Sequence, residues 1–290
     1  MAGKTQIKIK KKSEFMRTLK QMSYNKLAVF GAIVFAIELI LVILAPLIAP
    51  YGYAEMDMAA AYQPPSWAHL CGTDDLGRDI FSRLLYGGRY SITMGIFSIG
   101  ISVMLGIIIG STAGYFGGKV DNIIMRFLDI IQSLPGMLLT IVISAVLGSG
   151  YINTILSLSV NGIPGQARML RAQMMRVRGS EYIEAAESIN CSKFRIIAKH
   201  LIPNSFSPLI VQATMGVANM IIMAAGLSFI GLGVQPPASE WGAMLSGSRQ
   251  FIRSSPHMVF FPGLAIAITI LALNLMGDGL RDALDPKLKR

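Results

Sequence analysis

Charged side chains are scarce in this sequence and are missing altogether from long parts of it. Only 14% of the 290 residues are Asp, Glu, Lys or Arg, whereas soluble domains carry about 25%. Four runs contain none of these residues: 90–118, 130–167, 200–239 and 254–277. A helix needs about 20 apolar residues to cross a bilayer. Four such runs in one chain exclude a soluble domain and predict an integral membrane protein.

Cysteine and catalytic motifs are equally sparse. Cys71 and Cys191 fall in segments that we expect on opposite sides of the membrane, so we expect no disulfide and interpret both as small buried or interfacial residues. The sequence has no CxxC, H-E-x-x-H or G-x-S-x-G motif, and its three histidines are scattered. A metal site is therefore not expected, and a membrane enzyme has no catalytic constellation to support it.

A nucleotide-binding loop is also missing. The nearest match to G-x-x-x-x-G-K-[ST] ends in Gly118-Lys119, but Val120 stands where Ser or Thr would hold magnesium. Ala113 stands where the first Gly is required. We therefore expect no ATP site and no enzymatic activity in this chain, so that any motor has to come from a partner.

The hydrophobic pattern predicts an all-α integral membrane protein with six transmembrane helices. Their approximate bounds are 27–47, 91–115, 127–147, 152–174, 206–227 and 258–276. The first of these follows a long basic stretch, and we expect it to be retained as a helix rather than cleaved as a signal peptide.

Two departures from simple spans are expected. A short helix lying in the membrane interface is predicted around 76–85, where apolar residues repeat at helical spacing. The fourth span contains Asn161, Gly162, Pro164 and Gly165, so we expect its helix to be broken or kinked.

The distribution of basic residues predicts the orientation. The net charge is +10, but the basic residues are not interleaved with aromatics on a compact domain, so nucleic acid is not an expected partner. Six spans place both termini on one side, and that side carries 21 of the 26 Lys and Arg residues against 5 on the other. The positive-inside rule makes the richer side the cytoplasm. Residues 1–26 and 281–290 are then cytoplasmic tails, and 27–89 is the first span with an extracytoplasmic segment.

Small and charged residues within the spans are candidates for helix packing or for the transport path. Gly106, Gly110 and Gly114 form a small-xxx-small pattern that lets two helices approach closely. Glu38 is the one carboxylate inside a clear span, and it either has a function or packs against a neighbouring helix. An ion-coupled secondary transporter or channel would use Glu38 with Asp129 as coupling sites, and this remains the alternative class of function.

The longest charged interior segment, 168–199, contains a predicted short helix. Ser180 can cap its start, and Glu181 and Glu184 fall in its first turns, where the helix dipole favours anions. Ala185 and Ala186 give the helix a small, smooth face that could fit a groove on another protein. The alternative is an ordinary solvated loop helix.

This segment resembles the Glu-Ala-Ala loop of the membrane subunits of ABC importers. The resemblance rests on Glu184-Ala185-Ala186, Asn190 and the string 200–203, His-Leu-Ile-Pro. It implies that 181–190 is a coupling helix docked on an ATPase subunit, with these contacts: Glu181, Glu184, Ala185, Ala186, Asn190 and Pro203. Asn190 replaces the usual Gly of the family. Because Asn tolerates the left-handed conformation, we expect the shape of the loop to be kept.

Three further strings resemble the peptide/nickel branch of that family and its C-type permease subunits. They are 69–79 with 82–83 before the second span, 227–237 followed by 241–242 after the fifth, and 274–286 at the C-terminus. With them the resemblance covers about 23–290. It implies the type I ABC importer transmembrane fold, with a transport core at 90–280 and the first span wrapped around it.

The resemblance also implies an assembly in the cytoplasmic membrane. This chain would sit in lipid beside a homologous second permease, two ATPase subunits and an extracytoplasmic substrate-binding protein. ATP and magnesium would be bound by the ATPase subunits and no cofactor by this chain. The cargo would be di- or oligopeptides, with nickel chelates or glutathione as alternatives.

The segment before the second span has two interpretations. With carboxylates expected to be exposed, Asp74, Arg78 and Asp79 could contact the binding protein. Alternatively, the segment is a capped interfacial helix that only positions the second span.

Overall fold

The structure is a computed structural model and describes residues 20–284. The predicted tails at 1–26 and 281–290 therefore lie mostly outside the described residues. Within 20–284 the chain is helical and contains no β-strand, only an isolated bridge between Thr73 and Asp79. The predicted all-α class is confirmed.

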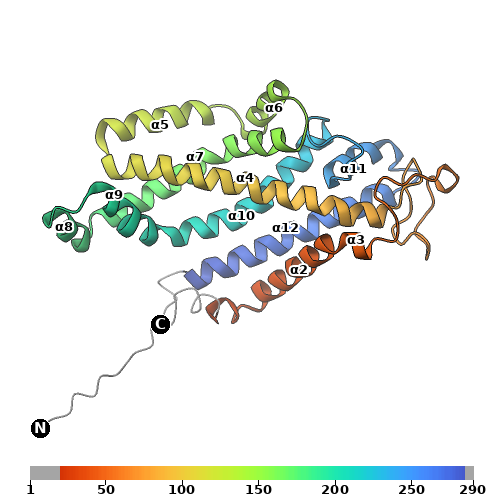
Figure 1. Cartoon of the computed structure of the whole chain (residues 1–290), viewed down its shortest axis with the longest axis horizontal. Helices are drawn as coiled ribbons and strands as arrows, with labels where there is room; N and C mark the ends of the chain where they lie inside the picture. Colours follow the sequence, from red (N-terminus) through yellow and green to blue (C-terminus); the bar gives the residue numbers. More distant parts are fainter. Residues whose placement is uncertain (1–19, 285–290) are drawn as a thin grey trace, which may run out of the picture.

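Long helices run side by side along one direction of the molecule (Figure 1). The helices up to the middle of the chain are α2 (Lys26–Ile43), α3 (Ala45–Ile48), the 3₁₀ turn η1 (Met58–Ala60), α4 (Ile80–Phe116), α5 (Gly118–Gln132), α6 (Gly136–Leu147) and α7 (Tyr151–Arg178). They are followed by α8 (Glu181–Ser188), α9 (Lys193–Ile196), the π turn η2 (Ile197–Leu201), α10 (Ile202–Phe229), α11 (Trp241–Ser248), the 3₁₀ turn η3 (Arg249–Phe251) and α12 (His257–Leu284).

The number of membrane spans agrees only roughly with the six predicted. Among the described residues, α2, α4, the continuous helix Lys193–Phe229 and α12 are long and apolar enough to cross a membrane. The bent pair α5–α6 makes a fifth if it counts as one span. The 28-residue α7 corresponds to the remaining prediction. It is long enough to span, but it is too polar to qualify on composition.

The third predicted span is not a single helix. α5 and α6 meet at an angle of 83°, and Pro135 stands between them in an extended conformation. Proline donates no backbone hydrogen bond, and its ring disfavours a helical conformation for Leu134 before it. The prediction of one helix over 127–147 was therefore wrong.

The fourth predicted span is less interrupted than expected. α7 continues through Pro164, so the predicted break is absent. At Gly162 the backbone approaches α4 and α10 so closely that an added Cβ would lie 2.4 Å from Ser102 Oγ and 2.7 Å from Met220. Contacts on both sides support the helix where proline removes one hydrogen bond.

The helix that was expected to lie in the interface is instead part of α4. Asp79 caps its start by accepting a hydrogen bond from the Ser82 N–H at 2.7 Å, and the helix then runs unbroken to Phe116. The predicted separate helix at 76–85 is therefore partly loop and partly the first turns of α4.

Small residues bring α4 and α7 together along most of their length. Gly106, Gly110 and Gly114 are all buried. A Cβ on them would lie 2.6 Å from Gln166 Cβ, 2.4 Å from the Ala167 carbonyl oxygen and 2.8 Å from Met174 Cβ, respectively. At these three glycines α4 lies directly against α7.

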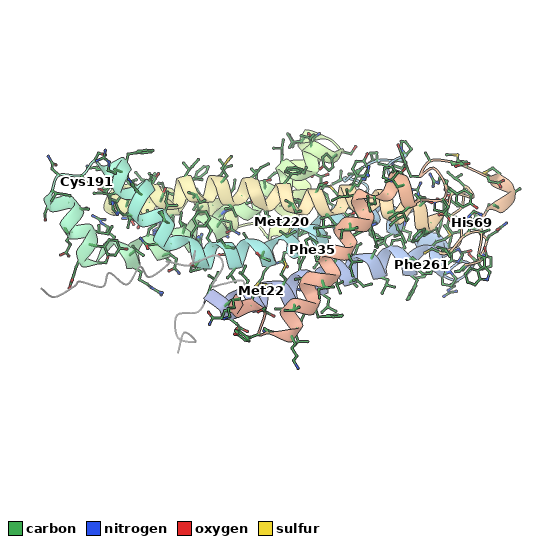
Figure 2. The ribbon with its side chains drawn as sticks, turned by 60° about the horizontal axis from the view of Figure 1, so that its bottom comes forward. Met22, Phe35, His69, Cys191, Met220 and Phe261 are labelled. Carbon is green, nitrogen blue, oxygen red and sulfur yellow. The ribbon has the colours of Figure 1, made fainter. Side chains whose placement is uncertain are left out.

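α2 lies along the outside of this bundle, against α12 (Figure 1). Gly31 of α2 approaches the Ala272 carbonyl oxygen, where an added Cβ would be at 2.7 Å. Phe35 of α2 packs on Leu273 of α12 and its neighbours, and Figure 2 shows it over the middle of the molecule. The figure also places Cys191 and His69 at opposite ends. Cys71 and Cys191 are both free thiols.

Candidate coupling and translocation sites

The short helix α8 lies at one end of the molecule, directly after α7 (Figure 1). Its inner face is apolar: Ile183 and Ala186 are buried in a cluster with Tyr115 of α4, Leu170 of α7 and Leu209 of α10. The helix is therefore attached to the ends of three long helices at once. A displacement of α8 would act on all three.

The start of α8 differs from the prediction. Ser180 occupies the N-cap position, but its hydroxyl makes no cap hydrogen bond. It donates instead to the Val177 carbonyl oxygen at 2.6 Å, in the last turn of α7. Glu181 and Glu184 do lie in the first turn and are exposed. Without the serine cap, the start of α8 is still stabilised by the negative charges of these two residues, which interact favourably with the helix dipole.

The end of α8 is a Schellman motif built on Asn190. Asn190 has φ 57, the left-handed conformation that was expected. Its N–H donates to the Glu187 carbonyl oxygen at 2.9 Å, and the Cys191 N–H donates to that of Ala186 at 3.1 Å. These are the two bonds that define the motif. Asn190 thus supports the turn that the family usually builds with Gly.

The two alanines of α8 have different surroundings. Ala185 is exposed, whereas Ala186 is only 7% exposed and packs inside the chain. The expectation of a smooth surface made by both alanines was therefore wrong for Ala186. Besides Ala185, the exposed residues of this segment include Glu184 and three large apolar side chains: Tyr182 and Ile189 at α8, and Phe194 on α9.

A continuous helix leads from α8 back into the bundle. It includes a π turn in which the Ile202 N–H reaches the Ile197 carbonyl oxygen, five residues earlier. Pro203 follows directly and has no N–H to donate, so the regular pattern is lost at this point. Pro203 is exposed at the start of α10.

Two ion pairs hold α5 against α7 near the same end. The Arg171 guanidinium donates to both carboxylate oxygens of Asp121, which is buried. Arg168 pairs with Asp129 at 2.7 Å in a more exposed position. Asp129 is thus engaged in a contact between two helices of this chain.

Glu38, the other residue of the ion-coupled alternative, lies elsewhere. It is half-buried on α2 beside Thr269 of α12, and its Oε2 is buried without a hydrogen-bond partner in residues 20–284. Figure 1 shows α2 and α5 on opposite faces of α4 and α10. The structure does not bring Glu38 and Asp129 together.

At the far end of the molecule, residues 72–79 form a tight loop before α4. Asp74 and Asp79 are 6% and 2% exposed, so the expectation of exposed carboxylates was wrong. Asp74 accepts hydrogen bonds from the Leu76 and Arg78 N–H groups and pairs with the Arg78 side chain at 2.6 Å. The two carboxylates organise the loop and the start of α4, which favours the positioning interpretation.

The surrounding residues close this loop tightly. The Asp79 carboxylate contacts His69 Nδ1 at 3.0 Å as well as capping α4. At Gly77, which has φ 71, an added Cβ would lie 1.7 Å from the Asp57 carbonyl oxygen. Burial, with a smaller effect of the nearby Asp79 charge, raises the pKa of the Cys71 thiol to about 11. Cys71 is therefore a packed, inert thiol.

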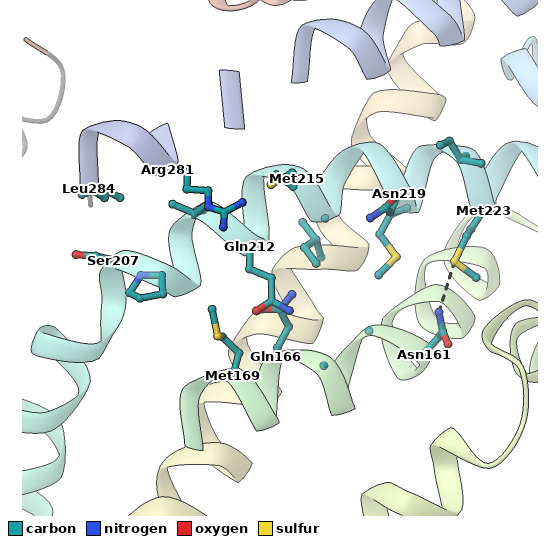
Figure 3. Close-up of a pocket in the computed structure, with 18 residues that line it drawn as sticks. Asn161, Gln166, Met169, Ser207, Gln212, Met215, Asn219, Met223, Arg281 and Leu284 are labelled. Carbon is teal, nitrogen blue, oxygen red and sulfur yellow. Dashed lines mark hydrogen bonds between the residues drawn. The ribbon is translucent and has the colours of Figure 1, made fainter. Parts of the chain in front are cut away.

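A cavity of about 740 Å³ lies between α7, α10 and the end of α12 (Figure 3). Four amide side chains line it: Asn161, Gln166, Gln212 and Asn219. Four methionines also line it: Met169, Met215, Met220 and Met223. Arg281 is its one charged residue among the described residues. Residues 20–284 contain no cluster of His, Cys, Asp and Glu that could hold a metal.

Comparisons with known proteins agree with this arrangement. The family described as the inner membrane component of binding-protein-dependent transport systems matches residues 102–290. A second family, described as the N-terminal transmembrane domain of oligopeptide transport permease C, matches 13–65. The chain belongs to this permease family.

Individual relatives match this permease over most of its length. A dipeptide transport system permease protein of Alkalihalophilus pseudofirmus is 43% identical over 96% of this chain and 91% of its own length. A glutathione transport system permease protein of Pectobacterium atrosepticum is 48% identical over 78% of this chain and 75% of its own. A subunit of the MetNI methionine ABC transporter in an inward-facing conformation has a TM-score of 0.57 at 18% identity, covering 71% of the permease and 98% of that chain. This last likeness shows a shared type I importer fold.

The cavity was missed by sequence reasoning, although a signal for it was present. Amides such as Asn161 and Gln166 make α7 too polar for an ordinary span. In the permease they face the cavity. Glu240 was missed as well: it is buried, and its carboxylate accepts hydrogen bonds from Ser91 and from the first N–H groups of α11.

Proposed function

We propose that this permease is the membrane subunit of an ATP-driven importer of di- or oligopeptides. It forms half of the translocation path with a homologous second permease in the cytoplasmic membrane. Two ATPase subunits bind ATP and magnesium, and an extracytoplasmic binding protein delivers the cargo. The proposal is supported by the names of relatives that match over most of the chain.

The observation that carries the proposal is the position of α8. Its inner face is fixed to α4, α7 and α10, and its outer face presents Glu184, Ala185 and large apolar side chains. Exposed apolar groups beside charges are typical of protein interfaces. In the proposed mechanism, closure of the ATPase dimer moves α8, and the attached helices open the path outward. Hydrolysis then resets them.

The sidedness and the outer contact also belong to the proposal. The α8 end, with the described ends of α2 and α12 on its side, faces the cytoplasm, as the 21 basic residues favour. A binding protein would meet the opposite end. Since Asp74 and Asp79 are buried there, Asp75 is the carboxylate of that segment that it can reach.

The proposed docking is tested by enlarging an exposed residue of α8. Ala185→Trp should cut ATP-dependent peptide uptake by at least ten-fold in proteoliposomes while the ATPase subunits still hydrolyse ATP, because the transmitted contact is lost. Ala36→Trp, at an exposed position of α2, is the matched control and should transport normally. Full coupled uptake by Ala185→Trp would refute the docking surface. Ala186 is unsuitable for the test because its substitution would disturb the buried cluster.

The cargo has a close alternative, since several relatives are named glutathione transport system permease proteins. A nickel chelate is the other. Binding assays of the partner binding protein with dipeptides, glutathione and nickel chelates would decide among them. Tight binding of glutathione alone would replace peptides as the cargo.

A further inference from the structure

One acceptor in the cavity has no hydrogen-bond partner within residues 20–284. Gln166 is 4% exposed, and its Oε1 atom is buried and unpartnered. A buried acceptor without a hydrogen-bond partner is destabilising. Gln166 also lines the cavity (Figure 3). Oε1 itself is covered by neighbouring atoms, so a bound donor group pairs with it only when a side chain of the cavity wall moves aside.

The position of Gln166 is closely determined. It lies on α7, and its Cβ fits against Gly106 of α4, where any added Cβ would approach to 2.6 Å. On the other side Gly216 of α10 leaves room for its amide, whose Nε2 is 4.0 Å from a Cβ built there. Three helices therefore hold the side chain at the cavity wall.

The rest of the cavity suits a main chain rather than a particular side chain. Gln212 and Asn219 add amide groups, which both donate and accept as peptide groups do. Methionines such as Met169 and Met215 are flexible and can adapt to apolar groups of different shape. The volume of about 740 Å³ lies within the range of small-molecule sites.

We propose that this cavity binds the main chain of a di- or tripeptide during transport, with Gln166 Oε1 accepting a hydrogen bond from a peptide N–H. The inference rests on the proposed function and adds a specificity-determining residue to it. Because the amides recognise groups that every peptide has, the permease passes peptides of different side chains. Selection among them is left to the binding protein.

The test compares a dipeptide with an analogue that lacks its one peptide N–H. Alanyl-alanine and the ester alanyl-lactate have the same shape, but oxygen replaces the N–H in the ester. Uptake of each is measured in proteoliposomes that contain the complete complex, at saturating binding protein. The binding protein's own preference cancels when the amide-to-ester ratio is compared between wild-type and variant permeases.

Gln166→Met keeps the side-chain volume and removes the acceptor. The wild-type ratio should exceed that of Gln166→Met by about three- to ten-fold, as expected for one hydrogen bond. Gln250→Met, an exposed position on η3 outside the cavity, should retain the wild-type ratio. ATP-driven uptake by Gln166→Met with an unchanged ratio would overturn the inference and leave the proposed function intact. Absence of ATP-driven peptide uptake in the wild type would instead reject the proposed function.

A second measurement covers the case in which Gln166→Met fails to assemble. A dipeptide carrying a diazirine side chain is photolysed on the wild-type complex during turnover, and the labelled residues are mapped. Labelling of Met169, Met215 or Met220 is the expected result. Labelling confined to other parts of the complex would overturn the inference, since a neighbouring subunit rather than cargo would then fill the cavity.

Discussion

Asn190 carries a conformational requirement that can be tested by itself. Its φ of 57 lies in the left-handed region, which costs roughly 1–2 kcal/mol for ordinary residues. Asn190→Val should therefore loosen the end of α8 and speed exchange of the Asn190 and Cys191 amides by about 5- to 30-fold. Asn190→Gly should leave exchange unchanged. Hydrogen exchange with mass spectrometry on the purified protein gives the comparison, and equal rates in the two variants would contradict this account of the turn.

Cys71 and Cys191 should differ sharply in reactivity. A thiol with a pKa of about 11 is almost entirely protonated at pH 7.5, and the thiolate is the reactive form. Cys71 is also buried, whereas Cys191 is half-buried at the other end of the molecule. Maleimide should label Cys191 first and Cys71 only after unfolding or at strongly alkaline pH. Rapid labelling of Cys71 in the folded protein at pH 7.5 would show that its loop opens.

At the residue scale, the sequence predicted the backbone conformation of a residue better than it predicted whether the residue is buried. The left-handed Asn190 followed from its residue type and its place in the loop. The burial of Ala186 and Asp74 did not, because it depends on helices and loops far away in the sequence. Gln166 was overlooked although the amides make α7 unusually polar, because the other helices that enclose the cavity are far away in the sequence.

At the scale of elements, the contact between α4 and α7 depends on glycine at chosen positions. An alanine at Gly110 would place Cβ 2.4 Å from the Ala167 carbonyl oxygen, so the helices would have to separate. Overpacking of this kind costs about 1–3 kcal/mol, and the unfolding temperature in detergent should fall by several degrees. Gly100→Ala on the same helix meets no atom within 4 Å and should unfold at the same temperature or higher, since alanine is the better helix former. A Gly110→Ala variant as stable as Gly100→Ala would show that α4 and α7 pack differently.

Helix ends and breaks were predicted less well than the helices. Apolar runs identified the long helices because period and length are local properties. Pro135 and Pro164 show the limit of that approach. Pro135 separates α5 from α6 by 83°, whereas α7 continues through Pro164. The difference is set by neighbouring helices, which crowd α7 at Gly162 on two sides.

At the scale of the whole molecule, the two ends should be accessible from opposite sides of the membrane. Trp67 is 98% exposed at one end and Phe194 is 81% exposed at the other. Both native cysteines are first replaced by alanine. In cells whose cytoplasmic membrane is intact but whose outer envelope layers have been made permeable, Trp67→Cys should react with a membrane-impermeant maleimide. Phe194→Cys should react only after the cytoplasmic membrane is permeabilised. The reverse pattern would invert the proposed orientation.

The glycine-packed pair of α4 and α7 has a mechanical consequence. Its 37-residue member is about 55 Å long, far longer than the roughly 30 Å of hydrocarbon it crosses. Because the backbones of α4 and α7 are in close contact at three glycines, the two helices should tilt together as one rigid unit rather than bend. A tilt of about 5° about one end would carry the other end by roughly 5 Å for a rod of this length. Small rotations near α8 would therefore be amplified at the outer loop that Asp79 ties to the far end of this rigid unit.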